Sequence, residues 1–473
     1  MLKRPLPDGY TPIRVTKLEY YPCIVYKCPI CNMDSVVVVK KYMKRAYENN
    51  SELLVSNNPE LAYRPTNIKV PYCPQCSIQM QYDMKSEFPV IFLYGRDMFT
   101  KKRVIYTIND IEPEFWIRKS DRYIIDKELS PVIKCRIKRI EDNGYYNYDG
   151  TELLKIVTYL PKDIHSDGIP SLRDKFPMHY QADILFETKA YTDMNLKQFV
   201  AVPKDRKSIS KRDIITNIEI DITETPPLRY VIYDIETRYA SGIELAKKGD
   251  APIYSITLYD NYTERFHILY NHYNKPNDIH DLLKIIKSKV YNYVNQVYCP
   301  RCADLYDSTV KECSHCSVDT TSLSEVNPKF SSFLMNANIN IVYAPTERDM
   351  LLAFMVLVKK LKPDLMGGHN SSEFDDRVIY NRIRKLIRDP PINITHRGFQ
   401  GILQFDFMTA WLATQRSKDV PHKLDDVANK ELGATKYSYD EDIDYLYKHD
   451  IPTLLTYNFI DVALTVGYNE RMR

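Results

Sequence analysis

Glycine is scarce in this sequence, with 13 residues among 473, and no glycine repeat of the phosphate-binding kind occurs. The patterns G-x-G-x-x-G and G-x-x-x-x-G-K-[ST] are both absent, which argues against a nucleotide-binding loop built on glycine. No apolar run approaches the roughly 18 residues that a membrane-spanning helix needs, which excludes an integral membrane protein. The N-terminal sequence lacks the apolar core of a signal peptide, so we expect a cytoplasmic rather than a secreted protein.

A large excess of either charge is also missing. Lys and Arg total 65 against 62 for Asp and Glu, a formal net charge of +3. This balance excludes a simple polybasic coat protein, so any contact with nucleic acid must come from local basic patches. Lys101–Arg103 and the five basic residues between Arg377 and Arg388 are two such patches. Each could contact phosphates, and each is equally well explained as a solvated surface.

The length suggests about three domains at roughly 150 residues each. Residues 1–225 alternate short apolar runs, such as Val90–Tyr94 and Tyr123–Ile125, with turn signals, which favours a β-rich region. We divide it into 1–105 and 106–225. From residue 226 predicted strands are followed repeatedly by predicted helices, among them 277–290, 350–361, 374–387 and 452–472. This alternation predicts an α/β unit over 226–473, with a mixed sheet flanked by helices.

Eight of the ten cysteines form four Cys-x-x-Cys pairs. Two pairs separated by ten residues could supply four thiolates to one structural zinc ion, and so could the two pairs separated by 41. The two pairs separated by ten residues, Cys299/Cys302 and Cys313/Cys316, indicate a zinc knuckle at about 295–320. This knuckle could brace a loop, grip DNA or dock a partner. Buried or redox-active thiols are the alternative explanation. The predicted zinc ligands are Cys299, Cys302, Cys313 and Cys316 for one ion, and Cys28, Cys31, Cys73 and Cys76 for the other.

Two carboxylates lie two residues apart in a predicted strand over Leu228–Glu236. Side chains alternate along a strand, so Asp234 and Glu236 are expected on the same face. Adjacent carboxylates on a half-buried strand repel each other, and a divalent cation is the usual compensation. An exposed pair on an edge strand is the ordinary explanation for an isolated Asp-x-Glu.

Two further acids lie on predicted helices. Asp375 is expected in the first turn of a helix over Phe374–Ile387, where a strand passes into a helix. Asp461 is expected one turn after Tyr457 on the same face of a helix. A hydroxyl beside a carboxylate can position a water molecule for attack. Stabilisation of a helix dipole by Asp375 and core packing of Tyr457 are the alternatives.

In their order and spacing these motifs resemble the 3′–5′ proofreading exonuclease domain of family B (α-type) DNA polymerases, especially those of the T-even phage type. The resemblance covers roughly residues 90–473. Tyr in the last motif, rather than His, separates the sequence from the free-standing proofreading subunits of bacterial replicases. The segments that carry the resemblance are Gly95–Ile117, His179–Phe186, Tyr233–Thr237, Gly368–Asp375, Phe405–Met408, Lys423–Ala428 and Tyr457–Val462.

The resemblance implies a ribonuclease H-like exonuclease domain, preceded by a β-rich N-terminal domain. The zinc-ribbon-like cysteine segments depart from the usual pattern of this domain, and we expect the Cys299 set to be an insertion within it. The resemblance further implies two Mg²⁺ or Mn²⁺ ions about 4 Å apart. Asp234 would bridge them, with Glu236, Asp375 and Asp461 completing the ligand set and Tyr457 orienting the attacking water. Asn370 and Phe374 would contact the terminal nucleotides of a single-stranded or primer-template DNA.

The palm motifs that follow this domain in the family, Tyr-Gly-Asp-Thr-Asp and Ser-Leu-Tyr-Pro-Ser, do not occur. We therefore expect the proofreading part of a split or truncated polymerase, which acts in DNA replication but does not extend a primer alone. A split enzyme would bind a separate palm and thumb subunit and, through it, a sliding clamp, in the host cytoplasm if the source is viral. A non-catalytic scaffold that binds DNA or the polymerase is the alternative function.

Overall fold

The computed structural model describes residues 5–27, 34–38, 81–165, 171–221, 225, 227–238, 242–299, 301–302, 305–306, 309–417 and 419–472. The predicted zinc ligands Cys28, Cys31, Cys73 and Cys76 lie outside the described residues. The chain divides into two compact units, Met1–Pro226 and Pro227–Arg473. None of the described helices is long and apolar enough to cross a membrane.

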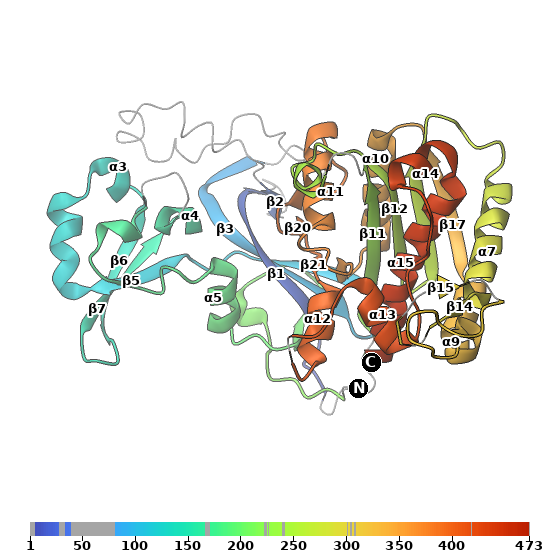
Figure 1. Cartoon of the computed structure of the whole chain (residues 1–473). Coiled ribbons are helices and arrows are strands. Elements are labelled where there is room, and N and C mark those ends of the chain that lie inside the picture. The colour runs from blue at the N-terminus through green and yellow to red at the C-terminus, as the bar shows by residue number, and fades with distance from the viewer. Residues whose placement is uncertain are drawn as a thin grey trace. The chain divides into compact units, whose positions relative to one another are not determined.

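The first unit is built around two sheets (Figure 1). One sheet has the order β10-β4-β3-β1-β2, with β9 paired to β1, and the other has the order β6-β7-β5-β8. The strands are β1 (Tyr10–Lys27), β2 (Asp34–Val38), β3 (Gln81–Asp97), β4 (Arg103–Ile108), β5 (Glu114–Arg118), β6 (Ile137–Tyr146), β7 (Glu152–Thr158), β8 (His179–Tyr180), β9 (Phe199–Pro203) and β10 (Ser208–Ile209). Helix α5 (Phe186–Asp193) packs on the first sheet through Phe186 and Ala190.

One expected strand in this unit is wrong. The run Tyr123–Ile125 leads into a helical turn over Ile124–Glu128 instead. Ile124 and Ile125 are both buried in the same core, beside Phe115 of β5. Consecutive strand residues point to opposite faces, so a strand here could not bury both isoleucines in one core.

The second unit is a six-stranded mixed sheet with the order β17-β13-β12-β11-β18-β21. Strands β11, β12 and β13 are antiparallel neighbours, whereas β17, β18 and β21 each join a parallel neighbour. The strands are β11 (Tyr230–Thr237), β12 (Ile253–Asp260), β13 (Arg265–Asn271), β17 (Asn338–Ala344), β18 (Leu365–Gly367) and β21 (Leu403–Gln404). The whole chain is thus a mixed α/β protein with several sheets.

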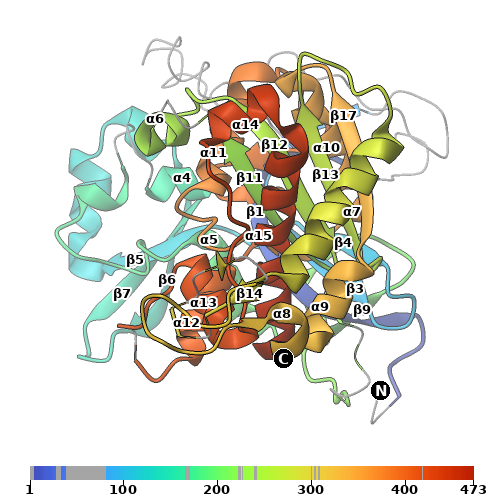
Figure 2. The same ribbon diagram turned by 45° about the vertical axis from the view of Figure 1, so that its right-hand side comes forward.

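Helices cover both faces of this sheet (Figure 2). On one face lie α7 (Ile279–Asn295), α9 (Pro328–Met335), α12 (Phe407–Thr414), α13 (Leu424–Leu432) and α15 (Ile451–Met472); on the other lie α6 (Ile243–Lys247), α10 (Glu347–Leu361) and α11 (Asp375–Leu386). The short helices α8 (Leu323–Val326) and α14 (Ile443–His449) complete the unit. For the four helices expected from the sequence, the bounds agree within five residues at each end.

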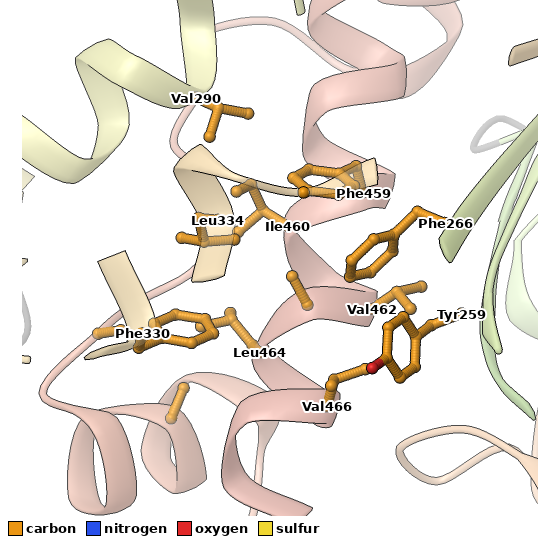
Figure 3. Packing of buried hydrophobic residues seen from close by; sticks show 14 of the residues in the cluster. Tyr259, Phe266, Val290, Phe330, Leu334, Phe459, Ile460, Val462, Leu464 and Val466 are labelled. Carbon is orange, nitrogen blue, oxygen red and sulfur yellow. The ribbon is translucent and has the colours of Figure 1, made fainter. Parts of the chain in front are cut away.

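Helix α15 passes through the larger core (Figure 3). Phe459, Ile460 and Val462 are fully buried, and Phe459 packs its ring edge-on against Phe266 of the sheet, with ring centroids 4.7 Å apart. A helix that is apolar on nearly every side is stable only when it is enclosed. A carboxylate carried by such a helix is therefore forced into a place that water does not freely reach.

Strand β11 divides its side chains between the two cores. Tyr230 and Ile232 pack under α15, whereas Val231, Tyr233 and Ile235 pack under α10 and α11. The two-residue period continues through Asp234 and Glu236. Both carboxylates therefore belong to the face that α15 covers.

Two glycines allow the strands to approach closely at the end of β18. A Cβ added to Gly367 would lie 1.8 Å from the carbonyl oxygen of Phe405, and one added to Gly368 would lie 2.3 Å from that of Tyr233. Both obstacles are backbone atoms, which cannot move aside as a side chain can. The Gly-Gly pair is needed for space, and the following loop delivers Asp375 to the start of α11.

We therefore expect Gly367→Ala to lower the free energy of unfolding by about 3 kcal/mol, the upper end of the usual overpacking cost. Gly144→Ala is the control, because Gly144 has a φ of +67° but no atom within 4 Å of the added Cβ. It should cost about 1 kcal/mol, from backbone conformation alone. Chemical denaturation followed by circular dichroism measures both, and equal losses would contradict the steric explanation.

Candidate active site

Three acids from two elements converge beneath α15. Asp234 and Glu236 come from β11 and Asp461 comes from α15. Each offers one carboxylate oxygen, and these oxygens all lie within 4.8 Å of one another. Asp461 is only 4% exposed. Three carboxylates this close and this poorly solvated repel one another strongly unless cations balance them.

Asn458 fixes the orientation of Asp234. Its side-chain amide donates to Oδ2 of Asp234 at 2.8 Å, and its own oxygen accepts from Oγ of Ser255 at 3.1 Å. Asn458 and Ser255 are both fully buried. Ser255 stands opposite Glu236 on the neighbouring strand β12. The chain of hydrogen bonds therefore joins α15, β11 and β12 at the level of the acids.

Lys436 is the cation that the structure places in this cluster, and the sequence analysis missed it. Its Nζ lies 2.6 Å from Oδ2 of Asp461 and donates to the Tyr457 hydroxyl at 2.5 Å. The backbone N–H of Lys436 donates to Asp425 at 2.6 Å, which ties it to α13. No motif surrounds this lysine in the sequence, and only the tertiary fold brings it to the acids.

The pKa values of the acids show that one lysine does not balance them. Burial, and then the nearby charge of Asp461, raises the pKa of Asp234 to about 7. Burial, together with Asp234 and Asp461, raises the pKa of Glu236. Burial also raises the pKa of Asp461, although Lys436 opposes the shift. Their ionised forms are therefore incompletely compensated.

Among the fully buried oxygens of the cluster, one has no hydrogen-bond partner within the described part of the chain. It is Oδ1 of Asp461, which is buried. A buried carboxylate oxygen without a donor is costly, and oxygen ligands of this kind suit hard divalent cations. The donor set and the electrostatics therefore both fit Mg²⁺ or Mn²⁺.

Asp375 lies beside the three-acid group rather than within it. It begins α11 and is 5% exposed. Burial raises its pKa, with further contributions from Asp234 and the adjacent Asp376, while hydrogen bonding from the backbone lowers it. Asp375 in turn contributes to the raised pKa of Glu236. The fourth predicted acid is thus electrostatically coupled to the others from the first turn of α11.

Tyr457 lies over the cluster from one turn before Asp461. Lys436 donates to its hydroxyl, and Tyr439 packs edge-on against its ring with centroids 4.9 Å apart. Burial and the charges of Asp461 and Glu236 raise the pKa of Tyr457. Its hydroxyl is therefore protonated at neutral pH and is available to orient a neighbouring oxygen atom.

The loop before α11 holds Asn370 and Phe374, which were predicted to touch substrate. Asn370 adopts a left-handed backbone with φ of +60°, and Phe374 is partly buried against the core under α10 and α11. His369 anchors this loop through contacts with the Tyr468 hydroxyl at 3.1 Å and the His422 carbonyl at 2.9 Å. Burial lowers the pKa of His369 to about 4, so it is neutral at physiological pH.

A second candidate metal centre lies in the segment between α7 and α8. Cys299, Cys302, Cys313 and Cys316 place their sulfur atoms within 4.8 Å of one another. Sulfur separations include 3.3 Å from Cys302 to Cys316 and 3.9 Å from Cys313 to Cys302. A tetrahedral zinc ion with bonds of about 2.3 Å would hold its sulfurs about 3.8 Å apart. The described cluster fits that ion, and we call this segment, with β14 (Val297–Tyr298), β15 (Leu305–Tyr306) and β16 (Thr321–Ser322), the cysteine knuckle.

We predict two zinc ions per chain, one at this cluster and one at the four cysteines outside the described residues. Cys313→Ser should remove one of them, because Ser is a poor zinc ligand. Cys135→Ser is the control, since Cys135 belongs to neither set and should leave the count unchanged. Metal analysis of purified protein by mass spectrometry measures this, and a protein without zinc would contradict both assignments.

Comparison with known proteins links these features to a family. A DNA-directed DNA polymerase of Escherichia phage RB69 is 22% identical over 267 residues, which are 52% of this chain and 26% of the phage protein. The structure of the family B DNA polymerase from the hyperthermophilic archaeon Pyrobaculum calidifontis shares the fold with a TM-score of 0.51 and 15% identity, over 81% of this chain and 44% of the archaeal one. The chain thus spans less than half the length of either relative. The family model for the exonuclease domain of DNA polymerase family B matches residues 178–420, about half of the sequence. The chain therefore belongs to DNA polymerase family B and contains its exonuclease domain.

Proposed function

We propose that this chain is a 3′–5′ exonuclease that removes nucleotides from single-stranded or mispaired DNA 3′ ends. The observation that carries the proposal is the convergence of Asp234, Glu236 and Asp461 within 4.8 Å. The family match supports DNA as the substrate, and the raised pKa values of the acids support a site built for cations. A structural role alone would not require three closely spaced carboxylates to face one another.

Asp234, Glu236 and Asp461 would hold divalent cations in this site, with Asp375 as the fourth acid. When bound, Mg²⁺ or Mn²⁺ supplies positive charge for the scissile phosphate and for the attacking and leaving oxygens. Asn458 donates to one oxygen of Asp234 and so fixes the orientation of this carboxylate. The buried helix α15 fixes Asp461, so this side chain does not have to be ordered during the reaction.

Tyr457 and Lys436 would act on the substrate rather than on the cations. The protonated Tyr457 hydroxyl can orient the attacking water, because it lies one turn from Asp461. Lys436 carries a positive charge next to this hydroxyl and can stabilise negative charge that grows on the phosphate. Asn370 and Phe374 would contact the terminal nucleotides from the loop before α11.

We further propose a ribonuclease H-like exonuclease domain over 226–473, after N-terminal regions 1–105 and 106–225. In this proposal the chain is the proofreading part of a split or truncated polymerase that acts in replication. A palm and thumb subunit would bind the same primer-template DNA and link the chain to a sliding clamp. The chain spans 26% of the length of the phage relative and 44% of the archaeal one.

A non-catalytic scaffold that binds DNA or the polymerase is the second candidate. The observation in its favour is Lys436, whose ammonium group already balances part of the charge of Asp461. A site neutralised by its own lysine would need fewer cations. Metal-dependent digestion of DNA separates the two functions.

We expect Asp234→Ala to reduce Mg²⁺-dependent digestion of a single-stranded 3′ end by about 10³-fold or more, because it removes a central metal ligand. Asp281→Ala is the control, since Asp281 is an exposed acid on α7 that pairs only with the nearby Lys284 among the described residues. It should keep wild-type activity. Shortening of a 5′-labelled oligonucleotide measures the activity of both variants. Near-wild-type activity of Asp234→Ala would reject the proposed function.

The pH dependence should respond to Lys436. Its charge lowers the pKa values of Asp234 and Asp461, so Lys436→Met should raise them and move the acidic limb of the pH–rate profile to higher pH. An adjacent opposite charge usually shifts a carboxyl pKa by 1–3 units, and we expect a shift of about one pH unit.

The profile of kcat/KM at subsaturating Mg²⁺ reports this shift, because it reflects the free enzyme. Lys430→Met is the matched control, since Lys430 lies on α13 and contacts Gln415 and the Trp411 ring rather than the acids. An acidic limb that stays in place in Lys436→Met would show that the lysine does not set the charge of the site.

A further inference from the structure

A polar pocket of about 700 Å³ lies between the cysteine knuckle and the segment Thr435–Tyr439. Its volume falls within the ~300–1,000 Å³ of typical ligand sites, so it can accept a nucleotide. Both walls belong to the second unit. The lining residues are Arg301, Cys302, Tyr306 and His315 on one side, and Asp425, Asp426, Asn429 and Thr435–Tyr439 on the other.

Two lining residues of the pocket also contact residues of the acid site. Lys436 lines the pocket and also contacts Asp461 and the Tyr457 hydroxyl. Tyr439 lines it and packs against the Tyr457 ring. A DNA strand with its 3′ end at Asp461 can therefore pass these two residues and enter the pocket.

Both walls are anchored to the end of α7. The Tyr293 hydroxyl donates to the carbonyl of Thr435 at 2.5 Å, and the Tyr298 hydroxyl donates to the carbonyl of Tyr293 at 2.8 Å. Tyr298 ends β14 and directly precedes Cys299. Helix α13 ends at Leu432 and leads directly into the Thr435–Tyr439 segment. A shared anchor keeps the pocket at a fixed place relative to the acids.

The side chains that face this space suit a single strand of nucleic acid. Arg301 and His315 are exposed on the knuckle wall and can contact phosphates. Tyr306, Tyr437 and Tyr439 provide aromatic faces on which bases can stack.

The two acids of the lining are already engaged by the protein. Asp425 accepts hydrogen bonds from the N–H of Lys436 and the hydroxyl of Thr435, and Asp426 accepts from the N–H of Lys423 at the start of α13. Hydrogen bonding to these N–H groups offsets part of their negative charge.

We propose that the cysteine knuckle forms the outer wall of a single-strand DNA subsite, which binds the nucleotides just upstream of the 3′ terminus. Arg301 and His315 contact the strand's phosphates, and the tyrosines receive its bases. This inference rests on the proposed function, because the acid cluster defines where the 3′ end lies. It gives the knuckle a role in substrate binding rather than only in bracing a loop or docking another subunit.

The test compares Arg301→Glu with Lys311→Glu in the full chain. Lys311 is exposed on the same knuckle but does not line the pocket, so both variants make the same charge reversal. Zinc content is measured for both, to show that the knuckle is intact. The probe is a fluorescein-labelled ten-nucleotide oligothymidylate, whose binding is followed by anisotropy without added divalent cation.

We expect Arg301→Glu to weaken binding about tenfold and to reduce the salt dependence of the affinity by about one counterion. Lys311→Glu should change the affinity less than twofold. In Mg²⁺, Arg301→Glu should raise KM for the oligonucleotide with kcat unchanged. The increase in KM should be smaller for a dinucleotide, because a dinucleotide does not fill the pocket.

Equal affinities of the two variants would overturn the proposal. A loss of kcat with KM unchanged would also overturn it, because that result identifies the knuckle as a brace for Lys436. Absence of hydrolysis by the wild type, with the binding difference intact, would instead reject the proposed exonuclease function and retain the subsite.

Discussion

Repulsion among closely spaced, poorly solvated carboxylates is the constraint on which this site depends. Asp234, Glu236 and Asp461 face one another where solvent is largely excluded, and burial and mutual charge raise their pKa values. Lys436 opposes this for Asp461 but supplies a single positive charge. Holding this much negative charge in one place lowers the stability of the fold. This is a common property of sites that bind divalent cations. Helix α15 holds Asp461 close to the other two acids, because the apolar residues of the helix are buried in the larger core.

The segments around the acids are also held in place by close packing and hydrogen bonds. Gly367 and Gly368 let β18 approach β11 and the Phe405 backbone, and the loop that follows carries Asp375 to the start of α11. On the other side, α7 anchors both the Thr435 carbonyl and the base of the cysteine knuckle. Asp234, Glu236 and Asp461 thus lie on β11 and α15. Lys436 and the pocket lie on segments that hydrogen bonds tie to α13 and α7 of the same unit. Such support is what positions substrate before the chemical step.

The sequence was informative where local pattern decides structure. The spacing of Asp234 and Glu236 assigns one face of a strand, and the interval from Tyr457 to Asp461 assigns one face of a helix. It was uninformative for Lys436 and Asn458, whose partners lie at other positions in the chain and become neighbours only on folding. Tyr123–Ile125 misled because apolar runs of three residues fit a strand and a helical turn equally well. The four-cysteine cluster was foreseeable, because its ligands are close in sequence.

Direct measurement of cation binding tests the central claim. Calorimetric titration of the full chain with Mn²⁺ should show two ions bound at the acids, in addition to the zinc already present. Asp461→Asn keeps the shape of the side chain but removes its charge, and it should abolish at least one of these binding events. A wild-type chain that binds no Mn²⁺ at millimolar concentration, or an Asn variant that binds it equally well, would contradict the account.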